Sequence, residues 1–114
     1  NFIIVFIGSI FMYKFVFFVP DSHIDAVKDA VFNAGGGKIG DYSHCSWQTL
    51  GTGQFKPLKG SNPYSGTVDE LHTVPEWRVE LVVEEPLMQT VVNAMKEAHP
   101  YEMPAYDVIN LEDY

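Results

Sequence analysis

The run YKFVFFV at residues 13–19 decides the fold, because aromatic and β-branched residues of this kind favour strands. The run ends at a proline, which has no backbone N–H to continue a strand ladder. Successive side chains of a strand point to opposite faces of the sheet. The two sets are Phe15, Phe17 and Val19 on one face and Val16 and Phe18 on the other. Both faces of this first strand are therefore apolar.

Two amphipathic helices are predicted downstream of the first strand. The first helix follows Ser22, a suitable N-cap, and it stops at the glycine run 35–37, where glycine accepts a left-handed conformation. The second helix opens at Pro86, whose fixed φ suits the first helical turn. Their apolar residues recur at helical spacing: Ile24, Val27, Val31 and Ala34 in the first, and Leu87, Val91, Ala94 and Ala98 in the second.

The remaining segments predict further strands and one long loop. Residues 38–49 mix β formers with a glycine and predict a second strand with a possible bulge. Glycines and prolines interrupt every period in residues 50–63, which predicts a long loop. A clearly alternating strand is expected over 77–83 and a last short strand from Tyr106 to Leu111, while residues 67–73 could add a further short strand before Pro75.

The resulting order βαββαβ predicts an α+β, ferredoxin-like fold in which two helices cover one face of an antiparallel sheet. The other sheet face then keeps the apolar side chains of the first strand exposed. Exposed apolar surface of this kind is usually buried by association. We therefore expect the open face to be an intersubunit surface, with coverage by loops or by the N-terminal segment as the alternative.

Composition narrows the partners and the compartment. The chain has 114 residues and a formal net charge of −8, which opposes binding to nucleic acid and to anionic membranes. A single cysteine cannot form an intramolecular disulfide, so a reducing cytoplasm is expected. Residues 1–11 are apolar, and we expect them to be an appended segment outside a single domain at 12–114, with an extra strand as the alternative.

Two motifs resemble known families. The segment HPYEMP, from His99 to Pro104, resembles the HPYExP signature of CutA proteins. The segment 37–66 resembles the PII-like domain inserted in Nif-three-type dinuclear metal proteins, and the chain looks like a small free-standing relative of that domain. The resemblance implies a trimer built around the sheet faces and, through CutA, divalent-cation tolerance and copper-like metals. It implies no hydrolase activity, because the metal-carrying halves of the Nif-three-type proteins are absent.

The candidate metal ligands are His44, Cys45, His99 and Glu102. Imidazole, thiolate and carboxylate groups suit zinc or copper. Their spacing forms no diagnostic motif, so a site requires the tertiary fold or a neighbouring subunit to bring them together. The alternatives are structural: His99 as a turn residue at the end of the second helix, and Cys45 as a small buried hydrophobe.

The sequence contains little that predicts catalysis. His44 with Glu102 is the one acid/base pair worth testing. The glycine run 35–37 precedes an expected strand, whereas a phosphate loop needs a following helix. Polar and aromatic residues along 42–49 predict either a small-ligand cleft between subunits or interface packing.

The leading functional hypothesis is accordingly a non-enzymatic, oligomeric metal- or small-ligand-binding protein of the CutA/PII-like class. The runner-up is a regulatory module that docks on another protein through the 50–63 loop without a metal. A hydrolase is the third.

Overall fold

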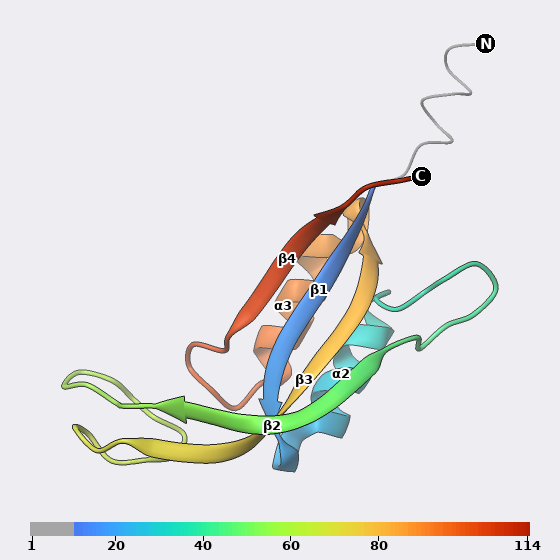
Figure 1. The fold of residues 1–114 in the computed structure, drawn as a ribbon. Helices are drawn as coiled ribbons and strands as arrows, with labels where there is room; N and C mark the ends of the chain where they lie inside the picture. Colours follow the sequence, from blue (N-terminus) through green and yellow to red (C-terminus); the bar gives the residue numbers. More distant parts are fainter. Residues whose placement is uncertain (1–10) are drawn as a thin grey trace, which may run out of the picture.

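The computed structural model describes residues 11–114 and contains one four-stranded antiparallel sheet with two helices. The elements in chain order are β1 (Met12–Pro20), a 3-10 turn η1 (Asp21–His23), α2 (Ile24–Asn33), β2 (Trp47–Phe55), β3 (His72–Glu84), a 3-10 turn η2 (Glu85–Leu87), α3 (Met88–Ala98) and β4 (Tyr106–Leu111). The strand order is β2-β3-β1-β4. The predicted α+β class and the order βαββαβ are confirmed, and both helices lie on one face of the sheet (Figure 1).

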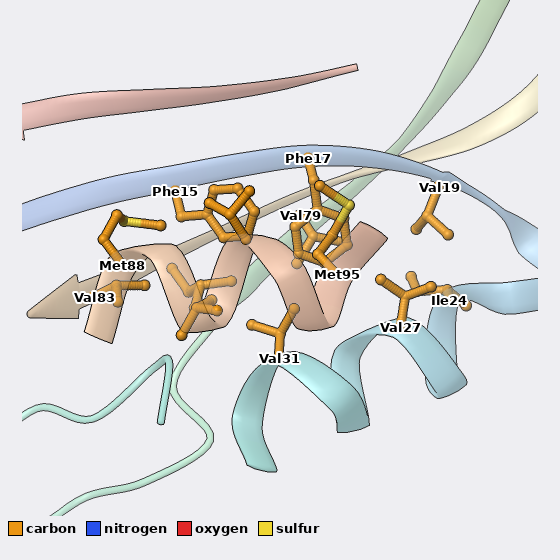
Figure 2. Close-up of a cluster of buried hydrophobic side chains, with 13 residues drawn as sticks. Phe15, Phe17, Val19, Ile24, Val27, Val31, Val79, Val83, Met88 and Met95 are labelled. Atoms are coloured by element: carbon orange, nitrogen blue, oxygen red, sulfur yellow. The ribbon is translucent and has the colours of Figure 1, made fainter. Parts of the chain in front are cut away.

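The core lies between the sheet and the two helices. Side chains of β1 point toward α2 and α3, as Figure 2 shows for Phe15 and Phe17. The predicted apolar residues of the first helix, Ile24, Val27 and Val31, are all buried. In the second helix the buried set differs from the predicted one: it is Met88, Val91, Val92 and Met95, while Leu87, Ala94 and Ala98 are half-buried. The 3-10 turn η2 precedes α3, which starts two residues after Pro86, and Leu87 and Ala98 still pack against the core.

The ends of the first helix show one correct and one wrong prediction. Gly35 has a φ of +107°, and its N–H donates to the Phe32 carbonyl. The glycine stop is therefore confirmed. Ser22 does not cap the helix: its hydroxyl lies 2.8 Å from Nδ1 of His23, and the chain enters α2 through η1.

The second strand was misplaced by the sequence prediction. Residues 38–46 form a loop with one isolated bridge between Ile39 and Tyr42, and β2 runs from Trp47 to Phe55 instead. Two of the glycines that predicted a loop at 50–63, Gly51 and Gly53, lie in β2, which is mostly exposed and needs few packing side chains. The long loop is residues 56–71.

The strand predicted at 77–83 is confirmed but longer: β3 has 13 residues and a proline inside it. Of the further short strand suggested at 67–73, only residues 72–73 belong to β3, and 67–71 lie in the loop. Pro75 fits because β1 reaches only as far as Glu76, so beyond that residue β3 has a partner on one side alone. Residues 52–55 and 72–75 therefore form a two-stranded arm that extends past the helices (Figure 1).

The open sheet face carries both apolar and charged side chains. Val16 and Phe18 lie on it, paired with Glu80 and Arg78 of β3, as the alternation in β1 predicted. They are not exposed as expected, because Val16 is fully buried and Phe18 is half-buried. Trp47 is 69% exposed at one edge of this face and Ile109 is 49% exposed near the other.

The predicted segment 1–11 lies outside the described residues except for Phe11, whose carbonyl accepts a hydrogen bond from the Glu85 N–H. Within the described part of the chain, no helix has the length and apolarity needed to cross a bilayer.

Candidate ligand-binding site

A pocket of about 260 Å³ lies where the base of the two-stranded arm meets the 56–71 loop and the turn 99–105. Its wall contains three aromatic side chains, two carboxylates and several small polar groups. The lining residues are Phe18, Gln54, Phe55, Pro57, Ser61, Pro63, Ser65, Glu76, Tyr101, Glu102, Met103 and Ala105. The pocket thus gathers residues from all the segments around the HPYEMP motif.

His99 holds the motif against β1. Its Nε2 lies 2.7 Å from the Phe18 carbonyl, which can only accept, so Nε2–H donates. Its Nδ1 accepts the Tyr101 N–H at 3.1 Å. Burial lowers the pKa of His99, the hydrogen bond to Phe18 opposes that effect, and nearby His23 lowers it further. The neutral ring with a proton on Nε2 therefore fits this position.

Tyr101 lies at the centre of a group of aromatic rings. Its ring centroid is 4.8 Å from that of His99, 6.1 Å from that of Tyr64 and 6.3 Å from that of Phe55. Its hydroxyl is buried and makes no hydrogen bond of standard geometry within the described residues, although the Glu76 carboxylate lies near enough to accept its proton. Burial raises the pKa of Tyr101, and the hydrogen bond to Glu76, the charge of that carboxylate and the neighbouring Tyr64 raise it further. The hydroxyl consequently keeps its proton at neutral pH.

Glu76 enters the pocket from β3, and its position depends on a glycine across the sheet. A Cβ added at Gly53 of β2 would overlap the Glu76 carboxylate, whereas a Cβ at Gly51 would meet nothing within 4 Å. Gly53 therefore provides the space in which the carboxylate lies. Glu102, the second acidic residue, accepts the backbone N–H of Asn62 at 2.8 Å and so links the motif to the 56–71 loop.

His44 and Cys45 lie in the loop 38–46, before β2 and not on it as predicted. The His44 ring is exposed, packs 4.7 Å from the Phe32 ring, and has a φ of +59°. The Cys45 N–H donates to the Gly37 carbonyl at 2.8 Å, and Gly37 in turn donates to Val82 of β3. This loop is thus attached near the end of β3 opposite to the pocket.

The predicted metal ligands fall into two separate pairs. His99 and Glu102 share the turn at the pocket, while His44 and Cys45 are adjacent in the other loop. Six residues of β3 separate the anchor points Glu76 and Val82, or about 20 Å at 3.3 Å per residue. Residues 11–114 contain no group of three or more His, Cys, Asp or Glu side chains able to hold a metal within one chain. The same separation keeps the acid/base pair His44 and Glu102 apart in one chain.

Four residues at the pocket were missed by the sequence analysis: Phe55 and Glu76 line it, and Tyr64 and Gly53 lie beside lining residues. The one available signal was Glu76, a charged residue in an apolar alternating strand directly after a proline. The contribution of Gly53 could not be predicted, because it depends on which residue of β3 lies diagonally across from it.

Comparison with known proteins places this fold. No family model matches the chain. CutA1 from Pyrococcus horikoshii superimposes with a TM-score of 0.64 at 17% identity, covering 90% of this chain and 85% of that chain. CutA from Synechococcus elongatus gives 0.63 at 12% identity. At these identities the likeness establishes the fold alone, so the chain has the CutA/PII-like fold.

Sequence similarity is higher to part of a larger protein. A Bacillus cereus protein related to NIF3 superimposes with a TM-score of 0.79 at 41% identity, covering 91% of this chain and 26% of that chain. Proteins named GTP cyclohydrolase 1 type 2 homolog match at 50% identity over 98 residues in Mycobacterium leprae and at 44% over 99 residues in Bacillus subtilis. The chain spans about a quarter of the length of these relatives. It is a CutA/PII-like domain related to one segment of the NIF3-type proteins, as the resemblance of its motifs predicted.

Proposed function

We propose that the chain is an oligomeric small-ligand-binding module of the CutA/PII-like class, and that it catalyses no reaction itself. The pocket at the turn 99–105 carries this proposal. It joins the HPYEMP motif, the arm and the 56–71 loop around a cavity whose polar groups are only partly used by the protein. A convergence of this kind is typical of a binding site.

The open sheet face supports assembly. Trp47 is 69% exposed and Ile109 is 49% exposed, and both lie on strands at the edges of the sheet, where further strands can pair. A homotrimer of copies packed through this face and these edges would bury both side chains. Lys14 and Asp107 on the same face would then need partners across the interface, whereas Arg78 already pairs with Glu80.

The ligand of this module could also be a metal ion. In an assembly, the loop with His44 and Cys45 of one copy could lie near the turn with His99 and Glu102 of another, and zinc or copper would suit those donors. The geometry of His99 opposes its part in such a site, because both of its ring nitrogens already take part in hydrogen bonds. His44, Cys45 and Glu102 are the ligands to test first.

Whole-protein activity is a separate matter. The curated relatives are named for GTP cyclohydrolase, but this chain matches only about a quarter of their length. We propose that, in those relatives, the segment similar to this chain lies beside the part that catalyses the reaction. The segment itself would not contribute the reacting groups. A reducing cytoplasm is the compartment we propose for it, on the basis of its single cysteine.

Light scattering at low protein concentration tests the assembly. We expect a mass that is a multiple of 12.8 kDa, with three copies favoured. Trp47→Glu should reduce the mass, because the variant places a charge on the open face. Leu58→Glu is the control, since Leu58 is also exposed at 64% but lies in the 56–71 loop. A wild type that stays monomeric would contradict the oligomeric part of the proposal, and a protein that binds no metal, amine, phosphate or GTP would contradict its ligand-binding part.

Metal analysis of tag-free protein separates the two forms of ligand binding. Stoichiometric zinc or copper that is lost in His44→Ala would support the metal site. Protein without stoichiometric metal leaves the pocket as the site.

A second candidate function is supported by the 56–71 loop. It exposes Leu58 at 64%, Val68 at 41% and Leu71 at 66%, and these apolar side chains are available to a partner surface. The alternative function is therefore a regulatory module that docks on another protein through this loop. The sequence predicted the docking loop at 50–63, and the structure has the loop at 56–71. Loss of a co-purifying partner in Leu58→Glu, with the mass of the module unchanged, would favour it.

A further inference from the structure

We infer that the pocket at the turn 99–105 binds a small organic cation, an alkylammonium or a guanidinium group that carries a short apolar chain. This inference rests on the proposed ligand-binding function and names the chemical class of the ligand. It is carried by the charge of the pocket wall, by its aromatic rings and by one unused hydroxyl.

The charge of the wall favours a cation. Glu76 and Glu102 line the pocket, and its lining includes no lysine, arginine or histidine. The one ion pair among the described residues joins Arg78 to Glu80, so neither pocket carboxylate is neutralised by a salt bridge there. The net charge of −8 adds an attraction for cations at longer range. A phosphate group would be repelled by the same carboxylates.

The aromatic rings favour an organic cation over a metal ion. Phe18, Phe55 and Tyr101 line the pocket, and aromatic faces attract ammonium and guanidinium groups. The ring of Phe18 already has the guanidinium of Arg78 at 5.8 Å from its centroid. Calcium and magnesium need six or more oxygen ligands, whereas the charged oxygen donors here come from two side chains within a largely apolar wall.

The size of the pocket also suits a molecule with several carbon atoms. Its volume of about 260 Å³ equals that of about nine water molecules at about 30 Å³ each. A dehydrated metal ion would leave most of this space empty. An aliphatic chain of four or five atoms against Pro57, Pro63 and Met103 would fill a large share of it.

The hydroxyl of Tyr101 provides a further acceptor. It is buried, makes no hydrogen bond of standard geometry within residues 11–114, and lies beside the Glu76 carboxylate, to which it can donate its proton while its oxygen accepts from a ligand. Buried polar groups without partners are rare in folded proteins and are often completed by a ligand. An ammonium N–H donor between Glu76 and Tyr101 would bond to both oxygens.

Isothermal titration calorimetry with n-butylammonium chloride and 1,4-diaminobutane dihydrochloride tests the inference at fixed ionic strength. We expect saturable binding to the wild type, with sodium chloride, inorganic phosphate and GTP as probes that do not bind the pocket. Glu76→Gln should weaken amine binding about tenfold or more, since a hydrogen bond to a charged group is lost. Glu84→Gln, at the far end of the same strand, is the charge-matched control and should leave the affinity unchanged.

A second pair of variants leaves every charge in place. Gly53→Ala should weaken amine binding, because the new methyl group occupies the space of the Glu76 carboxylate. Gly51→Ala should bind as the wild type does, since its methyl group meets nothing within 4 Å. Equal affinities for these two variants would overturn the assigned position of the cation.

The remaining outcomes separate this inference from the proposed function. Binding of phosphate or GTP but of no amine would overturn the inference and leave the ligand-binding function in place. A changed oligomer mass in Glu76→Gln without any amine binding would assign the pocket to a cationic side chain of a second copy, and would overturn a free ligand. Binding of none of the probes, together with no stoichiometric metal, would remove both.

Discussion

The turn 99–105 and the loop 38–46 lie at opposite ends of the sheet, and each contains a histidine that was a candidate metal ligand. In the turn, His99 is 7% exposed and makes hydrogen bonds through both ring nitrogens. In the loop, His44 is exposed, bonds only the neighbouring Ser43 hydroxyl, and packs against one ring. The same residue type therefore holds the structure together in one region and is free to react in the other.

Replacement of the two histidines should give the largest contrast. His99→Ala should lower the free energy of unfolding by about 2–4 kcal/mol, because it leaves the Phe18 carbonyl and the Tyr101 N–H without partners and opens a cavity. His44→Ala should change it by less than about 0.5 kcal/mol, as is usual for exposed residues. Urea denaturation measures both. Equal losses in the two variants would contradict the structural part assigned to His99.

Acidification should sharpen the same contrast. The pKa of His99 is lowered in the folded chain, chiefly by burial, so below about pH 6.5 the unfolded chain binds more protons than the folded one. Stability should therefore fall as the pH drops from about 6.5 through the lowered pKa of His99. Urea midpoints between pH 7.5 and 5 should decline in the wild type and decline less in His99→Gln. A wild-type curve parallel to that of His99→Gln would rule out this histidine as the cause.

Buried elements could be predicted from the sequence, whereas an exposed one could not. Strands and helices with a buried face were found correctly, because Phe15, Phe17 and Val27 repeat at the period of their element. The strand β2 was misplaced, since its residues are mostly exposed and include two glycines, so that neither period nor propensity marks it. Only the hydrogen-bonded pairing with β3 shows that these residues form a strand.

The candidate site was predictable only in part. The motif 99–104 was recognised from its residues, and its turn does line the pocket. The four candidate metal ligands were chosen by their chemical type alone. In the folded chain, His44 and His99 lie at opposite ends of the sheet. Glu76 and Gly53 depend on the register between two strands, which no local pattern specifies.

The smallest predicted effect concerns the hydroxyl of Tyr101. Tyr101→Phe should raise the free energy of unfolding by about 1 kcal/mol in the absence of ligand, because it removes a buried hydroxyl that has no partner while it keeps the ring. Tyr42→Phe is the control, since Tyr42 is 75% exposed and its hydroxyl is available to water. The same variant should bind n-butylammonium more weakly than the wild type does.

These opposite changes in stability and affinity identify a group that the fold tolerates for the sake of a ligand. The raised pKa of Tyr101 gives an independent measurement, because ultraviolet titration should show one tyrosine that ionises well above the usual value of about 10 and that is absent from Tyr101→Phe. In the wild type, stability should fall as the pH rises above about 10, where the unfolded chain loses the tyrosine proton first. A Tyr101→Phe variant that is less stable than the wild type by as much as His99→Ala would show instead that the hydroxyl has a bonding partner within the fold.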